Sequence, residues 1–218
     1  MLNTFARNLS ANDIHALVGD APVIVEAGCH DGTDTEQFLD AMPVARVFCF
    51  EPDSRPAARF KQRFSDDRRV TFYQQAVSDC DGYKPFFAST GKAGHMDDWD
   101  YSGSLCRPTN HLTRSPEISF KEPKGVSCVK LDTWHNCNPH IRMVDFCWAD
   151  LQGHQRAFIA GARLTLAVTK YLYIEAHHRP LYEGELTQDE LIALLPGFTP
   201  IGIYALDNIL FVNKHRLK

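Results

Sequence analysis

The sequence lacks the features that mark a membrane protein or a protein of an oxidising compartment. It has no apolar run of about 18 residues, the length that a membrane-spanning helix needs, and its N-terminus has no continuous apolar segment of the signal-peptide kind. Its seven cysteines are odd in number and form no Cys-x-x-Cys pair, which argues against a disulfide framework and a zinc site. These absences predict a cytoplasmic protein that does not bind a membrane.

A basic surplus is also lacking, because 23 Lys and Arg stand against 27 Asp and Glu, a formal net charge of −4. A nucleic-acid groove needs such a surplus, so nucleic acid is excluded as a partner. The basic residues between 55 and 69 have helical spacing and are expected to form a solvated face. No repeat, low-complexity tract or linker divides the 218 residues, so we expect residues 1–218 to form one domain.

The most informative motif begins with the apolar run at residues 23–27, which contains Glu26 and leads into Gly28-x-x-x-Gly32. About twenty residues later a second apolar run ends at Glu51, the spacing at which nucleotide-binding folds place a ribose carboxylate. Glycines let a backbone approach a ligand closely, and the helix that follows offers its amide groups. This pattern predicts a nucleoside cofactor with Glu51 on its ribose hydroxyls.

The turn also indicates which cofactor is bound. A dinucleotide site needs a second glycine where this chain has His30, and the carboxylates of Glu26 and Asp31 would repel a pyrophosphate. S-adenosylmethionine has no phosphate and carries an amino group, a sulfonium and a ribose, so it suits acidic neighbours. The motif therefore favours S-adenosylmethionine over a nicotinamide dinucleotide.

Alternating strand and helix patterns predict a doubly wound α/β fold, mostly parallel, with helices on both faces. Strands are expected at residues 23–27, 46–50, 70–77, 144–150 and 172–175. Helices are expected at about 13–18, 33–41 and 54–64, from 152–154 to 161, and at 187–195, with capping boxes at Thr33–Glu36 and Thr187–Glu190. Two last strands, at 198–204 and 209–213, form a hairpin that adds an antiparallel strand, unlike the parallel sheets of dehydrogenases.

One segment does not follow this alternation of strand and helix patterns. Residues 88–125 mix Gly, Pro, Ser and His with isolated aromatic residues, between extra strands expected at 84–89 and 126–131. A connection of this length is usually a functional or mobile loop. We expect the 88–125 segment to cover the acceptor.

From Val23 to Val212 the chain resembles the FkbM-type family of S-adenosylmethionine-dependent methyltransferases. The motifs that carry the resemblance are Glu26-Ala27-Gly28-x-x-x-Gly32, Phe50-Glu51-Pro52, Ala76-Val77-Ser78, Val129-Lys130-Leu131-Asp132, Asp150-Leu151-Gln152-Gly153-His154 with Gly161-Ala162, and Ile174-Glu175. Glu26 stands where Asp is usual and Gln152 where Glu is common. The resemblance implies a Rossmann-like methyltransferase fold and O-methylation of a small molecule, a glycan or a secondary metabolite.

The cofactor is then expected to contact four groups of residues. Glu26 orients the turn or meets the amino group, and His30, Asp31 and Thr33 surround the methionyl part. Glu51 and Pro52 meet the ribose. The adenine meets Asp79 or the backbone around Ala76, Val77 and Ser78. The full set of cofactor candidates is Glu26, Gly28, His30, Asp31, Gly32, Thr33, Glu51, Pro52, Ala76, Val77 and Asp150.

Methyl transfer to a hydroxyl needs alignment and a group that removes the proton. Asp150, at the end of the fourth main strand, is the first candidate for the base, and Glu175 and His178 end the neighbouring strand. With His177 they could also hold a divalent metal, which the sequence leaves open. His154 is expected to cap or pack and Trp148 to lie in the core, whereas Trp99, Tyr101 and Trp134 are candidates for stacking on the acceptor.

Two alternatives remain. An NAD-dependent oxidoreductase keeps the fold but conflicts with His30 and the closing hairpin. A non-catalytic or degenerate methyltransferase-fold binding protein would explain Gln152 and Glu26. The sequence allows a homo-oligomer, and it does not fix the oligomeric state or the small-molecule or glycan acceptor.

Overall fold

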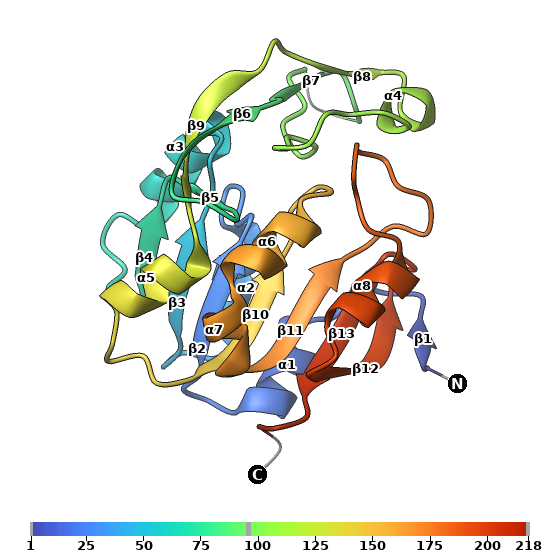
Figure 1. Ribbon diagram of the computed structural model, residues 1–218. Coiled ribbons are helices and arrows are strands. Elements are labelled where there is room, and N and C mark those ends of the chain that lie inside the picture. Colours follow the sequence, from blue (N-terminus) through green and yellow to red (C-terminus); the bar gives the residue numbers. More distant parts are fainter. Residues whose placement is uncertain (1, 95–96, 217–218) are drawn as a thin grey trace.

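The computed structural model describes residues 2–94 and 97–216 (Figure 1). Its centre is an eight-stranded sheet of order β1-β12-β13-β11-β10-β2-β3-β4, in which only β13 runs antiparallel to its neighbours. The strands are β1 (Thr4–Phe5), β2 (Val23–Ala27), β3 (Arg46–Phe50), β4 (Val70–Tyr73), β10 (Val144–Ala149), β11 (Thr169–Glu175), β12 (Phe198–Tyr204) and β13 (Asn208–Asn213). The expected doubly wound sheet with a closing antiparallel hairpin is confirmed.

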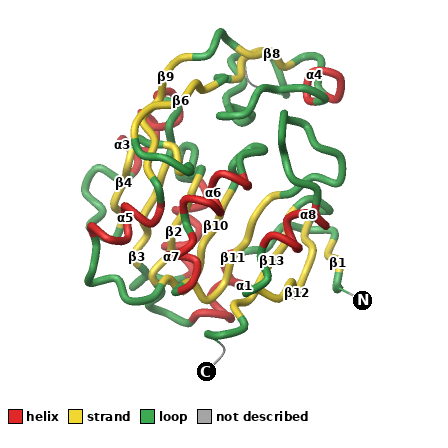
Figure 2. The backbone as a smooth tube through the Cα atoms, viewed as in Figure 1, coloured by secondary structure: helices red, strands yellow, loops and turns green. Residues whose placement is uncertain are grey.

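Helices cover both faces of this sheet (Figure 2). Buried residues of α1 (Ala11–Val18), α2 (Thr33–Ala41) and α3 (Ser54–Arg63) form one hydrophobic cluster against the sheet. Those of α5 (Leu131–Cys137), α6 (Gln155–Gly161), α7 (Arg163–Ala167) and α8 (Gln188–Leu194) form a second cluster on the opposite face. Adjacent β2 residues point to opposite clusters, as strand geometry requires. Each described helix is too short or too polar to span a membrane.

Two local predictions were wrong. Residues 70–77 form two strands, because β4 ends at Tyr73 and β5 (Ala76–Val77) pairs with β9 (Lys124–Val129) in a separate three-stranded sheet, β5-β9-β6. Thr33–Glu36 is not a capping box, since the N-cap of α2 is Gly32, which makes no side-chain cap. The second capping box, at Thr187 and Glu190, is present.

The 88–125 segment is not a structureless loop. It contains β7 (Ser89–Gly91), α4 (His111–Arg114) and β8 (Ile118–Phe120), and it lies between β6 (Gly82–Phe86) and β9. Figure 1 shows this segment above the carboxyl ends of the central strands. A bridge between Pro108 and Tyr182 also ties it to the loop after β11. The segment thus lies where ligands bind in open α/β sheets.

Candidate active site

A cleft opens at the carboxyl ends of β2, β3 and β10, and residues of the 88–125 segment form part of its wall. The cleft is open to solvent, and the space within and in front of it amounts to about 660 Å³. Its wall consists of Gly28, His30, Phe50–Asp53, Gln75–Val77, Phe86, Asp100, Tyr101, Gly103–Leu105, Asp150–Gln152 and His154. Three strand ends and the segment above them therefore converge on one space.

The turn after β2 depends on the lack of a side chain at Gly28. Gly28 has a φ of +88°, and a Cβ there would stand 1.9 Å from the carbonyl oxygen of Asp150. Its amide donates to the carbonyl of Phe50 over 2.9 Å, which joins the turn to β3. Gly32 serves a different purpose, because a Cβ there would strike the rings of Phe60 and Phe64. Gly28 thus shapes the cleft, whereas Gly32 allows α2 to pack against α3.

Glu51 presents its carboxylate to the cleft in a fixed orientation. Its Oε1 accepts from the amide of Asp53 over 2.7 Å and its Oε2 from the amide of His30 over 3.1 Å. Burial raises the pKa of Glu51 to about 7, against the opposing effect of these amides. The carboxylate is therefore placed at the end of β3, where the ribose was expected.

Glu26 points into the protein and not into the cleft. It is 1% exposed and accepts a hydrogen bond from the hydroxyl of Thr35 and a weaker one from the thiol of Cys49. Burial raises the pKa of Glu26 to about 8. Asp31 and Thr33 also lie outside the cleft wall, where Thr33 donates to Asp31 Oδ1 through its amide and its hydroxyl. Glu26 thus supports the turn from inside the protein, and Asp31 and Thr33 are hydrogen-bonded to each other.

Asp150 and Glu175 come together at the ends of β10 and β11. Gln152 Nε2 donates to Asp150 Oδ1 over 2.7 Å and to Glu175 Oε2 over 3.2 Å. Asp150 is exposed to the cleft, whereas the side chain of Glu175 is 16% exposed and lies behind it. Desolvation raises the pKa of both carboxyls.

The two histidines after β11 have different surroundings. His177 Nε2 lies 3.6 Å from Glu175 Oε1, and its Nδ1 lies 2.6 Å from Glu185 Oε1. His178 is exposed and makes no hydrogen bond or ion pair with the described part of the chain. Within residues 2–94 and 97–216, no group of three or more His, Cys, Asp or Glu side chains is arranged to hold a metal ion.

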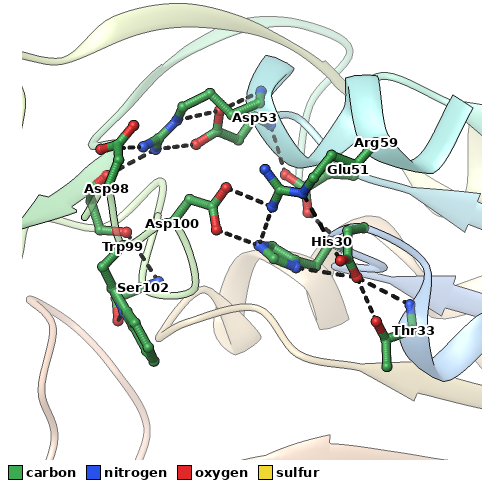
Figure 3. Close-up of polar contacts among 12 residues, drawn as sticks. His30, Thr33, Glu51, Asp53, Arg59, Asp98, Trp99, Asp100 and Ser102 are labelled. Atoms are coloured by element: carbon green, nitrogen blue, oxygen red, sulfur yellow. Dashed lines mark hydrogen bonds and ion pairs between the residues drawn. The ribbon is translucent and has the colours of Figure 1, made fainter. Parts of the chain in front are cut away.

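A cluster that the sequence did not predict joins the turn after β2 to the 88–125 segment, the covering segment of the cleft (Figure 3). His30 Nε2 lies 2.8 Å from Asp100 Oδ1, and Arg59 donates to Asp100 Oδ2 over 2.7 Å. The ring of Tyr101 packs on His30 with 3.9 Å between centroids. Asp100 is 4% exposed although it lies in a segment rich in polar residues, and no local sequence signal marks its partners.

The basic residues between 55 and 69 also contribute to this junction. Arg55 donates to Asp53 and to the carbonyl of Ser89, and it lies 3.0 Å from Asp98. Arg55 and Arg59 therefore connect α3 to the covering segment, and Figure 3 labels Arg59 beside its partner Asp100. Most of these basic residues are exposed, as expected, whereas Arg55 and Arg69 are half-buried.

The remaining candidates have structural contacts. His154 Nε2 lies 2.9 Å from Ser78 Oγ, and burial lowers the pKa of His154 to about 4, so it is neutral. Asp79 pairs with Lys84 outside the cleft wall. Trp148 packs on Phe38 and Tyr173, Trp134 packs on Phe48 and Phe50, and Trp99 donates to Ser102. Of the candidate stacking rings, Tyr101 lines the cleft.

A mostly parallel sheet with an antiparallel β13, and a cleft with an acid at the end of its second main strand, define the Rossmann-like methyltransferase class. Residues 26–200 match the methyltransferase FkbM domain, and the chain belongs to that family. It is therefore a methyltransferase that uses S-adenosylmethionine, which removes the oxidoreductase alternative.

One relative is the 2-O-methyltransferase NoeI of Sinorhizobium fredii (strain NBRC 101917 / NGR234), 38% identical over 177 residues that cover 81% of this chain and 72% of NoeI. Aeropyrum pernix fibrillarin, solved with S-adenosyl-L-methionine, aligns with a TM-score of 0.50 at 15% identity over 90% of this chain and 68% of fibrillarin. A putative rRNA-methylase from Clostridium thermocellum aligns with a TM-score of 0.50 at 12% identity over 92% and 90% of the two chains. These two structures show the fold alone.

Proposed function

We propose that this protein transfers a methyl group from S-adenosylmethionine to a hydroxyl group of a small molecule or glycan, with a sugar hydroxyl as the leading acceptor. The observation that carries the proposal is the 38% identity to a 2-O-methyltransferase over 81% of this chain. The cleft supports it, because it combines an acid suited to a ribose, Glu51, with a second acid suited to proton removal, Asp150.

The chemistry of the cleft wall fits the cofactor. Glu51 would accept hydrogen bonds from both ribose hydroxyls, and the wall at Ala76 and Val77 would receive the adenine. No described residue of the wall is Lys or Arg, whereas four are acidic: Glu51, Asp53, Asp100 and Asp150. Such a wall favours a cofactor with a cationic amino group and sulfonium and opposes a pyrophosphate.

The chain supplies alignment and a base. When bound, S-adenosylmethionine supplies an electrophilic methyl group on a sulfonium leaving group. Asp150, exposed to the cleft, would take the proton of the acceptor hydroxyl at a carboxylate oxygen. A base positioned in this way contributes about 10²–10⁴-fold to a rate.

The covering segment forms the acceptor side of the cleft through Tyr101 and Gly103–Leu105. An aromatic ring beside backbone groups suits the apolar face and hydroxyls of a sugar. Arg55 and Arg59 neutralise Asp53 and Asp100, so Glu51 and Asp150 are the wall carboxylates that would repel a phosphorylated or nucleotide-activated sugar. We therefore infer a neutral or cationic acceptor.

The test is methyl transfer from labelled S-adenosylmethionine to neutral sugars, amino sugars and sugar phosphates, with the product mapped by NMR. We expect a methyl ether on a neutral or amino sugar and an Asp150→Asn rate lower by about 10²–10⁴-fold. Asp20→Asn, at a side chain 82% exposed on the surface, should match wild type. Methylation at nitrogen or carbon would overturn the proposal, and cofactor binding without turnover on any acceptor would favour a non-catalytic binding protein.

A further inference from the structure

We propose that Asp150 and Glu175 share one proton, and that Gln152 and Tyr182 position this carboxyl pair so that Asp150 is the ionised member facing the cleft. The proposal rests on the proposed function, because it assigns the preparation of the base in that reaction. It concerns groups of the protein itself, so part of it can be tested before an acceptor is known.

The geometry of Gln152 is the first support. Its amide nitrogen carries two protons and lies within hydrogen-bond distance of both carboxyls, 2.7 Å from Asp150 Oδ1 and 3.2 Å from Glu175 Oε2. Its carbonyl oxygen lies 2.9 Å from the hydroxyl of Tyr182, whose single proton is also within reach of the Ser102 carbonyl at 3.0 Å. A reversed amide would direct oxygen at both carboxyls, which hold only one proton to donate, so the contacts with the two acids favour the orientation described.

The backbone of Gln152 is held as firmly as its side chain. Its φ is +46°, which is uncommon for a residue other than glycine. Ser104 of the covering segment donates to its carbonyl oxygen over 2.6 Å. The next residue, Gly153, lies so close to Tyr182 that a Cβ would stand 2.7 Å from the Tyr182 Cβ. Gln152 is therefore held between the covering segment and the loop after β11.

The charges around the pair favour a proton on it. Two ionised carboxylates on one amide repel each other, which raises the pKa of one of them. Besides the pair, the titratable groups that face it are His177, Glu185, Asp207, Tyr182, His30 and Asp34. Desolvation first, and then the charges of Asp150, Glu185 and Asp207, raise the pKa of Glu175 well above its ordinary value.

Exposure decides which member keeps the proton. Asp150 is exposed to the cleft, whereas Glu175 is 16% exposed and lies outside the cleft wall. The ionised form belongs at the wetter position, since water stabilises charge. When Asp150 then takes the proton of an acceptor hydroxyl, the pair passes from one proton to two and both carboxyls become neutral.

The first test uses the protein alone. Infrared difference spectra at neutral pH, wild type minus Glu175→Gln, count protonated carboxyl groups without cofactor or acceptor. We expect the variant to lose one protonated carboxyl. An unchanged count in a folded variant would overturn the shared proton, whether or not the protein methylates a sugar.

The second test separates positioning from folding by the pH profiles of kcat and KM. Gln152→Glu keeps the shape of the side chain but replaces the donor with a charge, so we expect kcat to fall roughly 10- to 100-fold and its acid limb to move to higher pH. Gln152→Asn retains tolerance of a positive φ but is too short to reach both acids, so kcat should fall without that large shift. Tyr182→Phe, which frees the amide, should lower kcat less than either.

Calorimetry with S-adenosylhomocysteine measures the cofactor affinity of all three variants separately, and we expect kcat to fall by more than the affinity does. A wild-type pH profile in folded Gln152→Glu would overturn the positioning role. Absence of methyl transfer by wild type would instead count against the proposed function, and the infrared result would still decide the shared proton.

Discussion

The α-carbon of Gly28 lies against the backbone carbonyl of Asp150, so close that a Cβ on Gly28 would stand 1.9 Å from that oxygen. This contact joins the turn after β2 to the end of β10, two strands that pair directly in the sheet. The proposed cofactor turn and the proposed base are thereby held at one edge. The contact leaves no space for any residue other than glycine.

Substitution of Gly28 tests this contact. Gly28→Ala should lower the free energy of unfolding by about 3–5 kcal/mol, because it combines a positive φ with overpacking against backbone. Gly184→Ala, at a φ of +73° with open space around it, should cost only about 1–2 kcal/mol. Urea denaturation of both variants makes the comparison, and equal losses would show that the Asp150 carbonyl imposes no constraint.

Cofactor affinity should depend on the protonation of Glu51. Its pKa is raised to about 7 by burial, and the ribose hydroxyls donate to its ionised form. The Kd of S-adenosylhomocysteine should therefore rise about tenfold for each pH unit below 7 and level off above it. Glu51→Gln removes this titration, so its weaker binding should vary less with pH; parallel curves for the two proteins would contradict the assignment.

Glu26 makes stability pH-dependent in a direction that can be worked out. Burial raises its folded pKa from 4.5 to about 8, so the folded state holds the proton more tightly than the unfolded state. The contribution of this proton to the free energy of unfolding is full below about pH 4.5 and is lost as pH rises through about 8. Glu26→Gln still accepts from Thr35 and does not titrate. Its free energy of unfolding should therefore rise relative to that of wild type by up to about 1.4 kcal/mol per pH unit in this window. Unfolding curves that keep a constant separation would contradict a buried, protonated Glu26.

Asp100 should control how tightly the covering segment is held. Burial opposes its ionisation, but hydrogen bonds with His30 and Arg59 outweigh that effect and lower the pKa of Asp100 to about 2. Asp100→Asn weakens both contacts, so amide hydrogen exchange in residues 98–105 should accelerate about tenfold. Asp97→Asn, at a carboxylate 88% exposed, is the matched control. Equal exchange in the two variants would rule out the His30–Asp100–Arg59 cluster as the connection.

The turn and the strand end at the edge of the cleft could be predicted because their sequence signals are local. The turn at Gly28 and the strand end at Glu51 rest on neighbouring residues, and their strands are adjacent in the sheet. Glu26 was harder to place, because its direction depends on the packing of Thr35 from α2 beneath the turn. His30 meets Asp100 across 70 residues and Gln152 meets Tyr182 across 30, pairings that no local pattern encodes.

The two missed strand and helix details have the same origin. Residues 70–77 carry apolar residues on both sides of Gln74 and Gln75, but the partner of Ala76 and Val77 is β9, some fifty residues further on, and not β3. Thr33 has the sequence of a helix cap, yet Gly32 adopts a left-handed conformation and takes the N-cap position. Tertiary pairing decided the first case and backbone conformation the second.

The most direct test of the account is a calorimetric titration of wild type, Glu51→Ala and Glu183→Ala with S-adenosylhomocysteine, and of wild type with NAD. Glu183 is a surface acid 70% exposed, so its variant controls for loss of charge alone. We predict binding to wild type and Glu183→Ala, binding to Glu51→Ala that is weaker by at least about tenfold, and no binding of NAD. Equal affinity of Glu51→Ala and wild type, or tighter binding of NAD, would contradict the site described.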